Sequence, residues 1–216
     1  MPGVVLEVFA TSKFEGLRAA EPNADSVVWN IVSDEVVATV ADSVTPQGIV
    51  ARCCNVVETI DELPQEVRLV AVCSEMRDPG NAGSVIRAAD AAGADAVILV
   101  GDSVDPQNPK AVRASVGSLF HLPVIAEPDI AVALAALRKR GLRILAADAA
   151  GESSLFDTDL AAATAWLFGS EAHGLADVAE LADARVSIPI YGKAESLNLA
   201  TAAAVCLYAS ARAHRP

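Results

Sequence analysis

The stretch IPIYGKAESLNLA, residues 188–200, decides how the second half of this chain is interpreted. It has the pattern of the end of a buried strand, a turn at Gly192, and a helix that opens with small polar residues and continues to about Ala213. The first N–H groups of a helix lack backbone partners, so a helix start can hold polar parts of a ligand. Ser196 and Asn198 therefore either cap this helix, as Ser and Asn often do, or face a substrate.

From Arg68 onward, apolar strands alternate with helical segments, which is the pattern of a mainly parallel sheet covered on both faces. The expected strands are Leu69–Ser74, Ala96–Val100, Ile144–Ala147, Ala165–Phe168 and Arg185–Ile188. The expected helices are Ala82–Ala92, Pro109–Ala114, Ile130–Arg140, Leu175–Leu181 and Glu195–Ala213. The fold class is therefore α/β, and we expect ligands to bind beyond the carboxyl ends of the strands.

The beginning of the chain has a less regular pattern. Its expected elements are strands at Val4–Phe9, Ser26–Val32 and Ile49–Cys54 and short helices ending at Ala20 and spanning Asp34–Ala41. About 60 residues are marginal for an independent core. Residues 56–66, interrupted by Pro64, have the composition of a linker. We therefore expect two domains, residues 1–60 and residues 68–216.

The net charge of −12 argues against general attraction to nucleic acid. The charge is unevenly distributed, because the first 66 residues carry 11 acidic and only 3 basic side chains. A site for a polyanion therefore has to be a local basic patch. The candidates for such a patch are Arg77, Arg87, Lys110, Arg113 and Lys193.

Several classes of protein are disfavoured by what the sequence contains. No apolar run reaches the ~18 residues that a membrane span needs, and the first residues lack the basic region of a secretory signal. The spacing of the cysteines and histidines fits neither a zinc site nor a disulfide framework, so we expect no metal. The usual glycine-rich nucleotide motifs are also missing, which disfavours an ordinary small-molecule enzyme. We expect a cytoplasmic protein whose cysteines are small core residues.

Two more loops that follow expected strands carry polar residues, and each has a structural and a functional interpretation. In the first loop, Asn81 is either a helix cap or a ligand contact, and Arg87, six residues later, is either a solvated side chain or part of a site. In the second loop, Gly169 allows close approach of a ligand to the backbone. Glu171 either pairs with a basic group or favours the following helix start. His173 is either a general base or an ordinary loop residue.

Taken together, these segments resemble a known family. NAGSVIR (81–87), GSEAHGL (169–175) and the stretch from IPI to SLN (188–198) are similar to the three ordered motifs of the SpoU/TrmH family, which are RNA ribose 2′-O-methyltransferases of the SPOUT superfamily. NPKAVRASVG (108–117) resembles the family's segment between the first and second motifs. The likeness covers about residues 68–213, and the order and spacing of the segments make it specific.

The resemblance implies an architecture that periodicity does not show. The second domain is expected to contain a C-terminal deep trefoil knot that holds S-adenosyl-L-methionine (AdoMet), and the protein is expected to be a homodimer with its sites near the subunit interface. Residues 23–55 resemble the later part of a substrate-binding domain that often precedes the knot. The basic early part of that domain has no counterpart, so the first domain is expected to be a truncated one.

The resemblance also implies roles for individual residues. The reaction site is expected to contain Asn81, Arg87, Glu171, Ser196 and Asn198. The cofactor is expected to contact Ala147, Gly169, Ile188 and Leu197. The candidate RNA contacts are Lys110 and Arg113, which lie in the segment between the first two motifs.

The implied activity is methyl transfer from AdoMet to a ribose 2′-hydroxyl of RNA, with rRNA favoured over tRNA. Arg87 is expected to clamp the target phosphate, because a guanidinium with a pKa above ~12 is a poor general base. The alternative is a knotted dimer that binds the cofactor and acts as an RNA- or protein-binding module without efficient methyl transfer.

Overall fold

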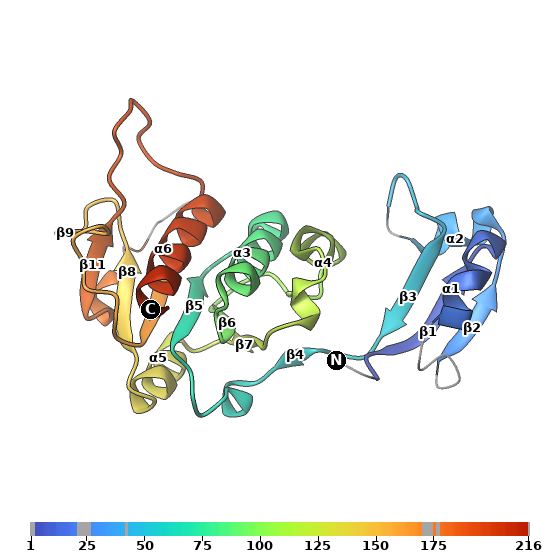
Figure 1. Ribbon diagram of the computed structural model, residues 1–216, viewed down its shortest axis with the longest axis horizontal. Coiled ribbons are helices and arrows are strands. Elements are labelled where there is room, and N and C mark those ends of the chain that lie inside the picture. The colour runs from blue at the N-terminus through green and yellow to red at the C-terminus, as the bar shows by residue number, and fades with distance from the viewer. Residues whose placement is uncertain (1–2, 21–26, 42, 170–174, 176–177, 216) are drawn as a thin grey trace. The chain divides into compact units, whose positions relative to one another are not determined.

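The computed structural model divides the chain into two compact units, Met1–Val56 and Val57–Pro216 (Figure 1). The residues that the structure describes are 3–20, 27–41, 43–169, 175 and 178–215. Among these residues, no helix has both the length and the apolar character needed to cross a membrane.

The first unit is a three-stranded sheet with two short helices. Its strands are β1 (Val5–Ala10), β2 (Val28–Ile31) and β3 (Ile49–Cys53), and its helices are α1 (Glu15–Ala20) and α2 (Asp34–Val40), with a 3-10 turn, η1, at Ser12–Phe14. The central strand β1 pairs in parallel with β2 and antiparallel with β3. The side chains that are buried in the described part of this unit are Val8, Ala10, Thr11, Val37 and Val56.

The second unit is built on an eight-stranded sheet in the order β4-β7-β6-β5-β10-β8-β11-β9. The strands are β4 (Val57–Glu58), β5 (Leu69–Ser74), β6 (Ala96–Val100), β7 (Val124–Glu127), β8 (Arg143–Ala147), β9 (Ser153–Ser154), β10 (Thr164–Phe168) and β11 (Ala184–Ser187). All of these strands pair in parallel. β5, β6 and β10 are buried along their whole length, as expected for strands covered on both faces.

Four helices of the second unit begin at side chains that cap them. The helices are α3 (Pro79–Ala92), α4 (Pro109–Ser115), α5 (Ile130–Lys139) and α6 (Leu199–His214), and the 3-10 turns are η3 (Ile60–Glu62), η4 (Ser118–Phe120) and η5 (Ala179–Leu181). The N-caps of α3, α4, α5 and α6 are, in that order, Asp78, Asn108, Asp129 and Asn198. Each accepts a hydrogen bond from a backbone N–H in the first turn of its helix.

Alternate residues of β10 show which helices cover each face of the sheet. Ala165 and Leu167 belong to one apolar cluster with residues of α5. Trp166 lies between them and points to the opposite face, where its Nε1 donates a hydrogen bond to Ser210 Oγ of α6 at 2.9 Å. α3 packs between α6 and α4, and Figure 1 shows these three helices side by side. α5 therefore covers one face, and α6 with its neighbours covers the other.

The order of the strands brings late segments of the chain to the centre of the sheet. β10 lies between β5 and β8, although both precede it in the sequence. Because the strands are parallel, the carboxyl ends of β5, β10, β8 and β11 meet at one edge. The loops at this edge include the segments that the sequence marked as unusual.

Two predictions about the elements of the chain were wrong. Residues 56–66 are not a plain linker, because Val57 and Glu58 pair with Val124 and Ile125 of β7. This pairing spans 67 residues of sequence, and local composition cannot show it. β7 and β9, which contain four and two residues, were missed as well.

The last helix also differs from its prediction. It begins at Leu199 with Asn198 as its N-cap, and not at Glu195. Ser196 therefore lies ahead of the helix and does not cap it. The predicted helix Leu175–Leu181 lies partly outside the described residues, and its described end is the 3-10 turn η5.

Candidate active site

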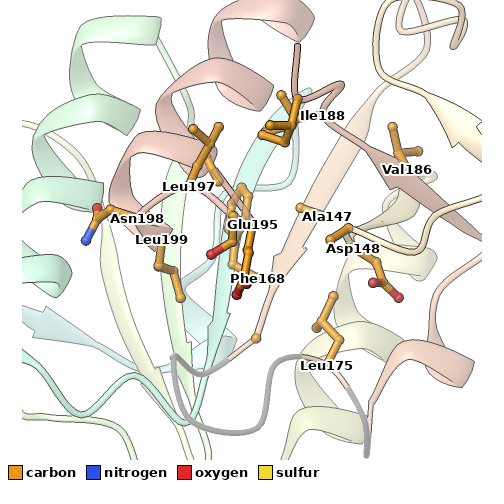
Figure 2. A pocket seen from close by; sticks show the side chains of 15 residues that line it. Ala147, Asp148, Phe168, Leu175, Val186, Ile188, Glu195, Leu197, Asn198 and Leu199 are labelled. Carbon is orange, nitrogen blue, oxygen red and sulfur yellow. The ribbon is translucent and has the colours of Figure 1, made fainter. Parts of the chain in front are cut away.

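A cavity of about 570 Å³ lies at the carboxyl ends of β8, β10 and β11, beside the segment that leads into α6 (Figure 2). Its apolar walls include Phe168, Leu175, Val186, Ile188, Leu197 and Leu199. Its polar side chains are those of Asp148, Glu195, Ser196 and Asn198. A cavity of this size with mostly apolar walls and a few polar groups is typical of a site for a small molecule or cofactor.

All four residues that were predicted to contact a cofactor line this cavity: Ala147, Gly169, Ile188 and Leu197. Ala147 ends β8 and Gly169 follows β10, whereas Ile188 follows β11 and Leu197 precedes α6. The fold thus brings four separate segments to one place. Their role as cofactor contacts remains a prediction.

The residues predicted for the reaction site are brought together only in part. Ser196 and Asn198 line the cavity, and Asn198 Nδ2 donates a hydrogen bond to Asn81 Oδ1 at 3.2 Å. Glu171 lies outside the described residues, as does His173. Ser196 and Asn198 therefore lie on the wall of the cavity, and Asn81 joins them through its hydrogen bond to Asn198.

Arg87 does not line the cavity of its own chain. It is exposed on α3, and the helical rotation of ~100° per residue turns it ~120° away from Asn81 around the helix axis. The six-residue spacing therefore does not place the two side chains on one face of α3.

A chain of polar contacts connects the start of α3 with the start of α4. Asp78 Oδ1 accepts a hydrogen bond from the N–H of Asn81 at 2.8 Å, and Asp78 Oδ2 lies 3.2 Å from Lys110 Nζ. The N–H of Asn81, followed by the ammonium of Lys110, holds the pKa of Asp78 below its ordinary value. Because Asn81 also contacts Asn198, these contacts lead from the cavity to Lys110.

Gly83 allows α3 and α4 to lie close together. A Cβ atom at this position would collide with the carbonyl oxygen of Ala111 and lie 2.6 Å from the Cβ of Ala114. The close packing fixes α4 beside α3, and α4 carries the exposed side chains of Lys110 and Arg113. Both of these predicted RNA contacts thus lie outside the cavity, on a helix held next to its edge.

The sequence interpretation missed other residues of the cavity, including Asp148, Phe168 and Glu195. Asp148 and Phe168 stand at the ends of β8 and β10, where the rule for parallel sheets places ligands, so this rule could have identified them. Glu195 directly precedes Ser196 but was assigned to a helix. Within the described part of the chain, no group of three or more His, Cys, Asp or Glu side chains could hold a metal ion.

Comparison with known families identifies the second unit. The model of the SpoU rRNA Methylase family matches residues 68–208. The chain belongs to this family. The resemblance that the motifs indicated is thereby confirmed, and so is the mainly parallel α/β architecture.

Relatives of this SpoU family member extend the match to the first unit. An uncharacterized tRNA/rRNA methyltransferase of Synechocystis sp. is 37% identical over 194 residues, which are 88% of this chain and 69% of the relative. The 23S rRNA (guanosine(2553)-2′-O)-methyltransferase RlmP of Bacillus subtilis is 31% identical over 212 residues, which are 96% of this chain and 81% of the relative.

Solved structures of SpoU methyltransferases have the same fold. AviRb of Streptomyces viridochromogenes, in complex with AdoMet, matches with a TM-score of 0.83 and 30% identity, over 96% of this chain and 82% of AviRb. An AdoMet-bound rRNA methyltransferase of Sinorhizobium meliloti matches with a TM-score of 0.85 and 29% identity, over 96% of this chain and 80% of the neighbour.

Proposed function

We propose that this SpoU family member transfers a methyl group from AdoMet to a ribose 2′-hydroxyl of RNA, with 23S rRNA favoured over tRNA as the substrate. The observation that carries the proposal is the meeting of Ala147, Gly169, Ile188 and Leu197 in one cavity. Relatives named as 23S rRNA 2′-O-methyltransferases and AdoMet-bound structural neighbours support it.

The cavity suits AdoMet in size and chemistry. Its volume of about 570 Å³ lies within the range of small-molecule sites, and its apolar walls suit a purine ring. Ala147, Gly169, Ile188 and Leu197 would hold the cofactor through backbone groups and apolar contact. When bound, AdoMet supplies an electrophilic methyl group on a sulfonium.

The residues of the chain then have to position the ribose. In this proposal Asn81, Ser196 and Asn198 hold the ribose beside the cavity, which the Asn198–Asn81 hydrogen bond and the positions of Ser196 and Asn198 on the wall support. Alignment of reacting groups can lower much of the barrier to reaction. Arg87 clamps the phosphate of the target nucleotide and thereby orients its 2′-hydroxyl. We assign Glu171 to the same site on the basis of its motif.

RNA is recognised outside the cavity in this proposal. Lys110 and Arg113 of α4 contact phosphates of the RNA, and residues 1–60 serve as the substrate-binding domain. The structural neighbours cover this first unit as well as the second, which supports the assignment. The location that goes with an rRNA substrate is the cytoplasm.

The proposal includes a knotted chain and a homodimer. The insertion of β10 between two earlier strands and the return of α6 over the sheet support the C-terminal trefoil knot. The dimer is supported by apolar side chains exposed beside the cavity, since Tyr191 is 87% exposed and Ile190 and Leu197 are each 37% exposed. The alternative of a binding module without efficient transfer finds no support in the comparisons.

Transfer of labelled methyl groups tests the proposed function. The purified protein is incubated with methyl-labelled AdoMet and unmodified transcripts of 23S rRNA or tRNA, and the nucleosides are identified after digestion. We expect 2′-O-methylated nucleosides from rRNA and none from DNA of the same sequence, which lacks the 2′-hydroxyl. Label in a base, or in no RNA at all, would contradict the proposal.

A further inference from the structure

Asp148 brings a carboxylate from a strand end to the wall of the cavity. It directly follows β8, and its N–H donates a hydrogen bond to the carbonyl oxygen of Val186 in β11 at 3.0 Å. Its side chain is 22% exposed. The sheet therefore fixes the backbone of Asp148, from which the carboxylate extends.

The Asp148 carboxylate keeps acceptor sites that no described residue occupies. Its Oδ1 accepts a hydrogen bond from the N–H of Ala150 at 2.9 Å. Its Oδ2 lies 3.8 Å from Arg185, which is beyond hydrogen-bond length, whereas Arg185 approaches Glu152 to 3.3 Å. A carboxylate offers about four lone-pair sites, so Asp148 can accept further hydrogen bonds from a ligand.

The charge of the walls restricts which part of a ligand can face Asp148. The ionisable side chains on the described walls are Asp148 and Glu195, both acids, and the described lining contains no Lys, Arg or His. Groups that meet these carboxylates must therefore be cations or hydrogen-bond donors. AdoMet offers both, in its sulfonium and ammonium groups at one end, in the two hydroxyls of its ribose and in the amino group of its adenine.

The positions of Asp148 and Glu195 indicate which donor groups of AdoMet each carboxylate would meet. Figure 2 shows Glu195 near Leu197 and the start of α6, whereas Asp148 lies across the cavity at the end of β8. Ser196 and Asn198, where methyl transfer is placed, adjoin Glu195 in sequence, so the sulfonium belongs on that side. Of the remaining donors, the ribose hydroxyls fit Asp148 best, because a carboxylate near a strand end is a known partner of ribose hydroxyls in α/β nucleotide sites.

We propose that Asp148 is a positioning residue of this site, whose Oδ2 accepts a hydrogen bond from a ribose hydroxyl of the cofactor. The inference rests on the proposed function, since it takes AdoMet as the ligand. It adds a residue that binds the nucleoside part of the cofactor, on the wall opposite the reacting groups.

Calorimetric titration with deoxy analogues tests the inference without any change to the protein. The probes are S-adenosylhomocysteine and its 2′-deoxy and 3′-deoxy analogues, added to the full-length wild-type chain. We expect one of the two analogues to bind at least about tenfold more weakly than the parent, because it lacks a hydrogen bond to a charged acceptor.

Two variants show whether Asp148 is that acceptor. Asp148→Ala should weaken binding of the parent by a similar factor and leave the affinity of the weaker analogue within about twofold, because the lost partner is already missing. Asp159→Ala is the matched control, since Asp159 Oδ1 likewise accepts a hydrogen bond from the N–H two residues on and Asp159 does not line the cavity. It should leave all three affinities unchanged.

The results separate this inference from the proposed function. If wild type binds both deoxy analogues as tightly as the parent, Asp148 does not accept from the ribose, and a contact with the adenine amino group would give this result. Equal weakening of all three ligands by Asp148→Ala would indicate a merely structural role and would also overturn the inference. If wild type binds neither AdoMet nor the parent, the proposed function itself fails.

Discussion

The hydrogen bond from Asn198 Nδ2 to Asn81 Oδ1, at 3.2 Å, joins two residues that are 117 positions apart in sequence. Asn198 also caps α6, because its Oδ1 accepts a hydrogen bond from the N–H of Thr201 at 3.2 Å. One amide side chain thus fixes the start of α6 and contacts the start of α3. Neither segment can form this edge of the site without the other.

The two functions of Asn198 can be separated by substitution. Asn198→Asp keeps an oxygen that can cap α6 but removes the N–H donor to Asn81, so we expect stability near that of wild type and a strong loss of methyl transfer. Asn198→Ala removes both the capping oxygen and the N–H donor, so it should also lower the free energy of unfolding by about 1 kcal/mol. Thermal melting and transfer of labelled methyl groups measure the two effects. Full activity of Asn198→Asp would show that the Asn81 contact is dispensable.

Gly83 should be intolerant of a side chain. We expect Gly83→Ala to destabilise the protein by about 1–3 kcal/mol, because the added methyl group collides with Ala111 and forces α3 and α4 apart. Gly192→Ala is the control, since a Cβ there meets nothing within 4 Å. Denaturant unfolding measures both. Unchanged stability of Gly83→Ala would mean that the two helices separate at little cost.

Arg87 should affect turnover and not folding. It is exposed, so Arg87→Ala should change the unfolding free energy by no more than about 0.5 kcal/mol. If it clamps the target phosphate, turnover on RNA should fall about 100-fold. Arg87→Lys should retain part of the activity, because it keeps the charge without the planar fork. Wild-type turnover by Arg87→Ala would remove this residue from the reaction site.

The four cysteines should differ in reactivity. Burial raises the pKa of Cys73 and of Cys206 to about 12, so both thiols should resist alkylation at pH 8 in the folded protein. Cys53 and Cys54 are only half-buried and should be modified first. Mass spectrometry with and without denaturant identifies the modified residues.

The same burial gives a dependence of stability on pH. Folded Cys73 and Cys206 keep their protons up to a pKa of about 12, whereas the unfolded chain loses them above about 9. The unfolded state thus binds fewer protons between these values, and stability should fall as the pH rises through this window. Replacement of either residue by Ser should make the fall less steep. A stability that rises from pH 9 to pH 10.5 would contradict the assignment.

The sequence predicted the regular part of the fold well because that part depends on local pattern. β5, β6 and β10 are continuous apolar runs, and their predicted bounds agree with the structure to within one residue. The caps of α4 and α5 stand directly before the predicted helix starts. The order of the strands depends instead on pairing between distant segments, which no local pattern records.

In the candidate site, too, some features follow from local sequence and others only from contacts between distant segments. Gly169, Ile188 and Leu197 came from motifs and Ala147 from its place at a strand end, and all four meet in one cavity. Asp148 was missed because an acid after a strand is common in sequences, and the rule for parallel sheets makes it one candidate among several until the fold shows it on the wall of the cavity. Motif resemblance carries information about positions, whereas the contacts of those positions have to be read from the fold.

The small interior of the first unit affects how heat denaturation should be read. With only Val8, Ala10, Thr11, Val37 and Val56 enclosed among its described side chains, this unit has little apolar area to hold it together. Calorimetry should then record a broad early endotherm followed by a sharper one, and cofactor should move only the later peak. A midpoint taken from one merged curve would mix two melting events and understate the gain from the ligand.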